Sequence, residues 1–480
     1  MARDGHVYIH SVVTPASPSR DEVCELADAA RRGPTAVQWS VATLLILGVV
    51  AIFVVDVPTG LAILHGLLFW IFAMAVAWRG VATGLARAPP RVARLPDAAL
   101  PSYTVIVPLY HEAAMVPGVV GALLGLDYPR CRLQILFALE GGDHETLAAL
   151  RAARRVGGFD ILVAPPGAPQ TKPRACSLAL AEASGEIVVI YDAEDRPHPL
   201  QLKEAAARFA AGGPRLACLQ APLRIAGARG FLPRQFALEY AAQFEVMLPA
   251  LARLGAPFPL GGTSNHFKAS VLKALGGWDP WNVTEDADLG FRLAAEGFTM
   301  DMLRTPTWES APTVLRDWLP QRARWVKGYM QTWGVHMRAP LDGGLRRAVA
   351  LQATLGLAIL SACAHGPVML VCMVEALIEL SGHRVTSPRA ADLALLVCGW
   401  GGAIAAMAVG AKRAGRRMSI LDGALAPLYW ALHSVAALKA AYQLCTRPYH
   451  WNKTPHAPPI GLRIGGGLDE PREASVRRAA

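Results

Sequence analysis

The chain has 480 residues, of which 53% are apolar and 18% are charged, and its formal net charge is +10. Soluble proteins average roughly 45–50% apolar and 25% charged residues, so this composition is that of a membrane protein. The basic residues form no concentrated stripe with nucleic-acid recognition motifs, which argues against a nucleic-acid partner. The eight cysteines include no Cys-x-x-Cys pair, which argues against a disulfide framework or a zinc site.

Apolar residues are concentrated in two blocks on either side of a mixed central region. In the first block, residues 35–57 and 61–78 can each cross a hydrocarbon core of about 30 Å, and they predict a membrane hairpin at residues 35–80. The first run begins too late for a signal peptide, and no cleavage site follows it. Residues 1–34 predict a loose polar tail. Basic residues around the hairpin predict that this tail and the central region are cytoplasmic.

The central region, residues 95–312, alternates short β-rich runs with helical stretches, which predicts a mostly parallel, Rossmann-like α/β sheet. The predicted strands are residues 103–109, 133–139, 161–164, 187–191 and 216–221. The predicted helices between them are residues 113–126, 146–156, 175–183 and 200–211. Ligands of such sheets bind beyond the carboxyl ends of the strands, where Glu112 and Asp192 fall.

Three carboxylates within four residues, Asp192, Glu194 and Asp195, follow the predicted strand at residues 187–191. Carboxylates crowded at the end of a buried strand are electrostatically costly without a cation. Asp192 and Glu194 alternate along the chain and point to one face, with Asp195 nearby. Oxygen ligands of this kind suit Mg²⁺ or Mn²⁺, so a divalent metal site is predicted here.

A second acidic group, Thr284-Glu285-Asp286, precedes a predicted helix at residues 289–296. Acids favour the first turn of a helix, so an N-capping cluster is the structural alternative for this group. Further along, a basic amphipathic stretch at residues 316–333 contains the run Gln321-Arg322-Ala323-Arg324-Trp325. An interfacial tryptophan beside basic residues is the alternative interpretation of that run.

The second apolar block, residues 346–446, holds three stretches of different character. Residues 348–380 contain Pro367 and predict an interfacial helix that runs into a kinked span. Residues 391–411 are uninterrupted and end in a basic run, which predicts a span that ends in the cytoplasm. Residues 418–445 carry charges and a proline, which are costly in lipid. An interfacial or re-entrant helix pair is therefore predicted, with the tail at residues 447–480 cytoplasmic and a fifth ordinary span as the alternative.

An ordered series of motifs runs through the central region and into the second block. The series is Glu112, Lys172, Asp192-Ala193-Glu194-Asp195, Thr284-Glu285-Asp286 and Gln321-x-x-Arg324-Trp325. Its order and spacing resemble the membrane-embedded family 2 glycosyltransferases, the processive, cellulose synthase-like enzymes, over about residues 103–456. The resemblance implies an α/β GT-A domain flanked by transmembrane helices, with interfacial amphipathic helices at residues 313–345.

The resemblance also implies roles for individual residues. Asp286 would be the general base that deprotonates the acceptor, and the carboxylates that follow residue 191 would hold Mg²⁺ or Mn²⁺ on the diphosphate of the donor. Lys172 and Arg324 would contact that diphosphate, and Trp325 would pack on the acceptor sugar. The remaining residues expected to bind substrate are Glu112, Glu140, Asp143, Glu285, Gln321, Trp451 and Lys453.

Two of these expectations are open at the level of sequence. The family usually has an acidic pair that contacts the nucleotide base, whereas one position here is glycine, so either Glu140 or Asp143 could serve. Trp451 and Lys453 resemble a mobile gating loop over the nucleotide.

The activity that the resemblance implies is sugar transfer at the bacterial inner membrane, by a multi-pass hexosyltransferase with a cytoplasmic catalytic domain. The donor would be a nucleotide diphosphate sugar, expected to be UDP-linked, and the product a β-linked polysaccharide. A single-addition enzyme that glycosylates a membrane lipid is the alternative. Membrane lipids and accessory export subunits are the further partners that this activity allows. A transporter with a non-catalytic domain is the rival of another class.

Overall fold

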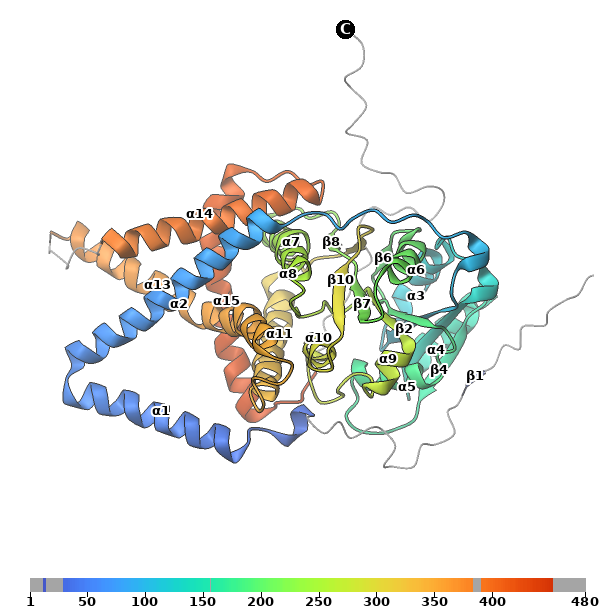
Figure 1. Ribbon diagram of the computed structural model, residues 1–480, viewed down its shortest axis with the longest axis horizontal. Coiled ribbons are helices and arrows are strands. Elements are labelled where there is room, and N and C mark those ends of the chain that lie inside the picture. The colour runs from blue at the N-terminus through green and yellow to red at the C-terminus, as the bar shows by residue number, and fades with distance from the viewer. Residues whose placement is uncertain (1–11, 14–28, 156, 383–389, 452–480) are drawn as a thin grey trace, which may run out of the picture.

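The computed structural model describes residues 12–13, 29–155, 157–382 and 390–451. An α/β domain lies on one side of the molecule and a group of long apolar helices on the other (Figure 1). The α/β domain is built on an eight-stranded sheet with the order β1-β4-β3-β2-β5-β9-β7-β10. Its strands are parallel except β9, which runs antiparallel to β5 and β7. The predicted α/β class with a mostly parallel sheet is confirmed.

All five predicted strands are present, and three short strands join them. The strands are β1 (Val12–Val13), β2 (Tyr103–Leu109), β3 (Leu133–Glu140), β4 (Asp160–Ala164), β5 (Ile187–Ile190), β7 (Leu216–Gln220), β9 (Asn265–Lys268) and β10 (Thr299–Met302). A smaller sheet holds β6 (Arg196–Pro197), β8 (Leu223–Ile225) and β11 (Thr307–Glu309). Strands of two to four residues carry too little periodicity to be found from sequence.

Helices cover both faces of the large sheet, because alternate residues of its strands point to opposite sides. In β2, Val105 and Val107 pack on one face while Ile106 packs on the other. The first face is covered by α3 (Val116–Leu124), α4 (His144–Ala153) and α6 (Gln201–Ala211). The second is covered by α5 (Lys172–Ala181), α8 (Leu248–Arg253), α9 (Ala269–Ala274) and α10 (Glu285–Ala295).

Four helices among the described residues are long and apolar enough to cross a membrane. They are α1 (Ala36–Val55), α2 (Val57–Leu85), the continuous segment Leu345–Leu380 and α14 (Ala390–Arg413). The segment Leu345–Leu380 consists of α12 (Leu345–Leu351), a π turn (Gln352–Gly356) and α13 (Leu357–Leu380). The first three are at most 6% buried by the rest of the protein and α14 is 22% buried, so most of their apolar surface is open to face lipid.

The helix pair predicted at residues 418–445 is wrong, because this segment forms one continuous helix, α15 (Ile420–Thr446). Pro427 lies inside it and removes the hydrogen bond that the carbonyl of Gly423 would accept. The indole Nε1 of Trp400 donates to that carbonyl at 3.2 Å instead, so the helix continues. In Figure 1, α15 (red) runs across the direction of α13 and α14.

Both ends of α15 contact helices from earlier in the chain. Near its start, the Asp422 carboxylate pairs with Arg234 of α7 (Phe231–Ala242) at 2.5 Å. Just beyond its end, the carbonyls of Arg447 and His450 accept from Lys327 of α11 (Leu315–His336) at 3.3 and 2.9 Å. A helix held in this way at both ends lies along α7 and α11, which fits an interfacial helix.

Candidate active site

A cavity of ≈ 2060 Å³ opens at the carboxyl ends of the central strands and continues between α2, α13 and α14. Most of the residues predicted to act on substrate line it. They are Glu112, Glu140, Lys172, Asp192, Glu194, Glu285, Asp286, Gln321, Arg324, Trp325 and Trp451. Side chains that are far apart in sequence therefore face one space, which reaches from the α/β domain into the apolar helices.

Lys172 and Asp192 form an ion pair on the wall of the cavity. Lys172 is the first residue of α5, and its Nζ lies 2.5 Å from Asp192 Oδ1 and 2.6 Å from the carbonyl of Gly262. Burial acts to lower the pKa of Lys172, but the carboxylates of Asp192 and Glu285 outweigh it and the pKa is raised. The ammonium group is thus a permanent positive charge beside a helix N-terminus, which is a favourable place for a phosphate.

The other carboxylates predicted to bind metal have different surroundings. Asp195 is fully buried, and its Oδ2 accepts from the backbone N–H of Asp192 at 2.7 Å and from the hydroxyl of Thr263. Glu194 lines the cavity, whereas Asp195 does not. Sequence reasoning missed Glu309, which ends β11 and also lines the cavity. Its strand has three residues, so the sequence pattern offered no signal for it.

The donor set of this corner fits a divalent cation. Burial, and then the charges of Asp192 and Glu194, raise the pKa of Asp195 well above the usual range. Burial, and then the charge of Asp195, do the same for Glu309. The Oδ1 atom of Asp195 is buried and has no hydrogen-bond partner in the described part of the chain. The same part contains no ready-made group of three His, Cys, Asp or Glu ligands. Mg²⁺ typically takes only one or two carboxylates and completes its shell with substrate phosphates.

Glu285 and Asp286 occupy the first turn of α10, which begins four residues before the helix predicted at residue 289. Burial, and then the charge of Asp286, raise the pKa of Glu285 to about 8. Burial also raises the pKa of Asp286, against the opposing effect of Lys172 and Arg324. A Cβ atom at Gly262 would lie 3.7 Å from Asp286 Oδ2 and 3.8 Å from Lys172 Nζ. The carboxylate of Asp286 and the ammonium group of Lys172 therefore lie close together beside Gly262.

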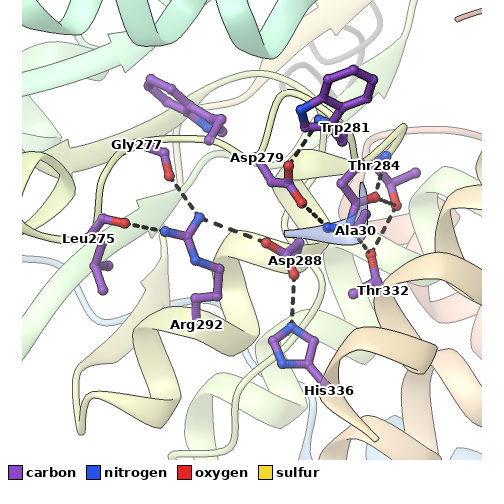
Figure 2. A network of polar contacts seen from close by, with 12 residues as sticks. Ala30, Leu275, Gly277, Asp279, Trp281, Thr284, Asp288, Arg292, Thr332 and His336 are labelled. Carbon is purple, nitrogen blue, oxygen red and sulfur yellow. Dashed lines mark hydrogen bonds and ion pairs between the residues drawn. The ribbon is translucent and has the colours of Figure 1, made fainter. Parts of the chain in front are cut away.

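A buried polar network fixes α10 behind the cavity (Figure 2). Asp288 lies 3.0 Å from His336 Nε2 of α11 and 3.8 Å from Arg292, which also donates to the carbonyl of Gly277 at 2.8 Å. Burial acts to raise the pKa of Asp288, but the hydrogen bond and charge of His336 lead the opposing interactions and lower it. The carboxylate therefore stays ionised and holds the helix in place.

The loop before α10 is tied to the segment that leads into the first apolar helix. Asp279 accepts from the backbone N–H of Ala30 at 2.6 Å and of Trp281 at 2.9 Å, as Figure 2 shows. Close packing joins the same loop to α11, because a Cβ atom at Gly328 would lie only 2.3 Å from Thr284 Cγ2. The position of the acidic pair thus depends on contacts from two other parts of the chain.

The Gln-x-x-Arg-Trp residues project from α11 toward the same space. Arg324 donates to the carbonyl of Val283 at 3.2 Å, and its guanidinium carbon lies 4.5 Å from the ring centroid of Trp451. The Oε1 atom of Gln321 is buried without a hydrogen-bond partner in the described residues. The predicted tail residue Trp451 therefore lies at the cavity, while Lys453 lies outside the described residues.

Arg322, inside the same motif, was not predicted to matter. Its guanidinium carbon lies 4.5 Å from the ring of Trp325 and 4.6 Å from that of Phe236. Its Nη1 donates to Glu239 at 2.7 Å, and Tyr429 of α15 also donates to Glu239 at 2.7 Å. The sequence did show a cation, Arg322, directly after Gln321 of the motif. Its partner Glu239 on α7 lies some eighty positions earlier in the chain, so no local pattern connects the two.

The structure separates the two candidates for contact with the nucleotide base. Asp143 caps α4, accepting from the backbone N–H of Thr146 at 3.1 Å and of His111 at 2.6 Å. It does not line the cavity. Glu140 does line it, at the end of β3, and lies 3.4 Å from Arg174. Of the two, only Glu140 is placed to reach a ligand.

Known proteins share the sequence pattern and the fold. Residues 104–265 match the family model described as Glycosyl transferase family 2, and residues 187–409 match Glycosyl transferase family group 2. A β-monoglucosyldiacylglycerol synthase of Synechocystis is 28% identical over 48% of this chain and 50% of its own length. A poly-β-1,6-N-acetyl-D-glucosamine synthase of Staphylococcus epidermidis is 24% identical over 46% of this chain and 52% of its own. The chain spans about half the length of these curated relatives.

One solved structure shows the fold. A mannosyltransferase from Pyrobaculum calidifontis, in complex with GDP-mannose and Mn²⁺, superimposes with a TM-score of 0.53 at 20% identity. The match covers 80% of this chain and 97% of that protein. The predicted GT-A fold is confirmed.

Proposed function

Because this chain carries a family 2 glycosyltransferase domain, we propose that it transfers a sugar from a nucleotide diphosphate sugar to a hydroxyl group of an acceptor that enters from the membrane side. One observation supports this proposal above all. The acidic pair Glu285 and Asp286, whose pKa values are raised, shares a cavity wall with the cations Lys172 and Arg324.

The donor fits the part of the cavity at the ends of β2, β3 and β5. Lys172 and Arg324 would offer positive charge to the diphosphate, and Glu140 at the end of β3 would accept a hydrogen bond from the base of a uridine nucleotide. Asp192 and Glu194, with the unpartnered Oδ1 of Asp195 behind them, would hold a divalent cation such as Mg²⁺ or Mn²⁺. When bound, that cation neutralises charge on the diphosphate.

Asp286 is the proposed general base. A carboxylate whose pKa is raised by burial binds a proton more readily than an exposed one. It removes the proton of the acceptor hydroxyl while that oxygen bonds to the anomeric carbon of the donor. The bond from this carbon to the diphosphate oxygen breaks on the opposite face, with inversion. The nucleoside diphosphate leaves with the electron pair, which Lys172 and Arg324 stabilise.

The membrane helices and the basic residues around them support an inner-membrane placement with the catalytic domain in the cytoplasm. Two acceptor classes are consistent with the relatives, whose names include a glycolipid synthase and a polysaccharide synthase. A growing β-linked polysaccharide is the acceptor that the Gln-x-x-Arg-Trp motif favours, and a membrane lipid is the other.

The proposal is tested by incubating the purified, detergent-solubilised chain with a panel of UDP- and GDP-sugars and measuring release of free nucleotide. We expect release with one of these donors, dependent on Mg²⁺ or Mn²⁺ and abolished by a chelator. The matched control is the Asp286→Asn variant. If no donor is consumed faster by the native chain than by this variant, the proposal is wrong.

A further inference from the structure

The lining of the cavity changes in chemistry along its length. At the inner end stand the carboxylates and cations of the catalytic site. Next to them, polar and aromatic side chains of α7, α11 and α15 form a middle zone. Beyond that, α2, α13 and α14 contribute a section whose walls are mostly apolar. A lipid bound with its reacting headgroup at the catalytic site would need these three environments in the same order: charged, then polar, then apolar.

We propose that the acceptor is a membrane lipid with a free hydroxyl in its headgroup, which lies lengthwise in this cavity. This inference rests on the proposed sugar transfer and names the class of its acceptor. The hydroxyl lies beside Asp286, the headgroup lies in the middle zone, and the hydrocarbon chains lie between the membrane helices.

The middle zone has the groups that a hydroxylated headgroup needs. Gln321 Oε1, buried and without a partner in the described residues, is an acceptor for a hydroxyl. The indole of Trp325 offers an apolar face, held by the guanidinium of Arg322 at 4.5 Å. Glu239 and His433, 3.5 Å apart, add an acceptor and a titratable nitrogen on the same wall.

The next section suits hydrocarbon and disfavours a sugar chain. Its walls include Phe72 and Val76 of α2, Leu357 and Ala358 of α13, and Leu396 and Met407 of α14. A polysaccharide carries several hydroxyl groups on each ring, and each one buried without a hydrogen bond costs about 1–3 kcal/mol. Acyl chains bring no polar group of their own into this section and gain from burial.

Polar side chains are few along this section, where Arg79, Ser361 and His365 also line the cavity. They become more frequent towards the far end, where Glu375 and Glu379 line it and His65 and Asp392 pair at 3.0 Å. The apolar section therefore separates two polar ends, as expected if it holds hydrocarbon. The arrangement of the helices is consistent with this, because α2 packs on α14 while α13 packs on α15. The cavity lies between these two helix pairs.

The acceptor class is tested with the full chain reconstituted into two kinds of vesicle and given a radiolabelled donor. One kind contains the total lipid extract of the native organism, and the other contains only phosphatidylcholine, which has no free hydroxyl. We expect the label to enter the organic phase on a product of lipid size with the first kind alone. Label in a water-soluble polymer with either kind would overturn the inference while leaving the proposed sugar transfer intact.

A second arm tests the location of the lipid. Ala358→Trp fills the apolar section and is expected to lower lipid glycosylation by about 10²-fold, as for a misplaced substrate. Equilibrium binding of the nucleotide sugar and thermal unfolding, measured on the same preparation, show whether the variant is folded and binds donor. Val371→Trp is the control, since Val371 is on the same helix, is 56% exposed and lies off the cavity.

A further pair on α14 covers the case in which the first variant fails to fold. Leu396 lines the cavity, and its neighbour Val397 does not. Leu396→Trp should therefore lose lipid transfer and Val397→Trp should keep it. Equal transfer by both members of each pair would show that the lipid does not lie here.

Discussion

At the scale of single residues, two adjacent carboxylates at the start of α10 differ in what surrounds them. Asp286 is half-buried and lines the cavity, while Glu285 is only 5% exposed. Burial raises both pKa values, and the charge of Asp286 raises the pKa of Glu285 further. Lys172 and Arg324 oppose this and keep the pair ionisable.

The first prediction concerns the base. Asp286→Asn should lower sugar transfer by roughly 10²–10⁴-fold, because general-base catalysis contributes about this much. Donor binding should change little, because the cations Lys172 and Arg324 remain. Initial rates and equilibrium binding of the nucleotide sugar, measured on the same preparation, separate the two effects. If Asp286→Asn transfers sugar at the native rate, Asp286 is not the general base.

The second prediction concerns pH. The pKa of Glu285 is about 8 in the folded chain, against an ordinary value near 4.5, so the folded state binds this proton more tightly than the unfolded state. Its contribution to stability is therefore full below the ordinary value and is lost as pH rises toward 8.

Thermal unfolding of the ligand-free chain in detergent, followed from pH 5 to pH 9, checks this sign. We expect Tm to fall with rising pH, and to fall less in Glu285→Gln, which has no proton to lose. If Tm changes with pH in the same way in the native chain and in Glu285→Gln, then the pKa of Glu285 is not raised in the folded chain.

At the scale of elements, α11 supports the acidic pair through close packing. Gly328 faces Thr284, and a Cβ atom there would approach it to 2.3 Å, whereas a Cβ atom at Gly334 on the same helix would meet nothing within 4 Å. We therefore expect Gly328→Ala to lower turnover by about 10²-fold, since a shift of about 1 Å at a reacting group can have this effect.

Gly334→Ala is the matched control and should retain full turnover. Both changes give the same gain in helix propensity, up to about 1 kcal/mol. Steady-state kinetics of the two variants, side by side, isolates the contact with Thr284. Equal rates would mean that the loop before α10 adapts without effect on the site.

The placement of α15 gives the fourth prediction. If α15 lies at the membrane surface, Ile420 and Thr446, both exposed near its two ends, are on the same side of the membrane. In a cysteine-free background, Ile420→Cys and Thr446→Cys should both resist a membrane-impermeant thiol reagent in intact cells. Both should react after permeabilisation. Labelling of only one of them from outside would mean that α15 crosses the membrane.

The elements also show how much of the fold could be predicted from the sequence. Strong periodicity and long apolar runs predicted the five central strands, α1 and α14 to within a few residues. They also predicted α2, which is longer at both ends than the run at residues 61–78. The motif series predicted the residues that line the inner cavity. Glu309 and Arg322 were missed because their importance comes from partners distant in sequence. The continuity of α15 was missed because the indole of Trp400 compensates for Pro427, a tertiary contact that no local pattern encodes.

At the scale of the whole molecule, the catalytic domain and the apolar helices are packed as neighbours. A Cβ atom at Gly410 of α14 would lie 2.3 Å from the carbonyl of Ala241 of α7, so the two helices are in close contact. Trp318 of α11 and Phe236 of α7 share a buried cluster with Tyr429 of α15. The catalytic half thus relies on later helices to cover its apolar surface.

A fragment of residues 95–345 is therefore expected to be unstable alone, because α7 and α11 would expose apolar side chains that α14 and α15 cover. We expect the fragment to aggregate in plain buffer, whereas the full chain in detergent is expected to be monodisperse. Size-exclusion chromatography with light scattering is the measurement. A monodisperse, thermally stable fragment in plain buffer would contradict this dependence.

The indole of Trp451 rests on the guanidinium of Arg324, the cation that we assign to the departing diphosphate. A diphosphate oxygen accepts from the N–H groups at the edge of a guanidinium, whereas the indole covers its face, so a bound donor brings negative charge next to the Trp451 ring. The environment of this indole would then differ between the empty and the loaded enzyme. Its intrinsic fluorescence would report donor occupancy in real time, and the rate of that signal would set an upper limit on how often the site can be refilled.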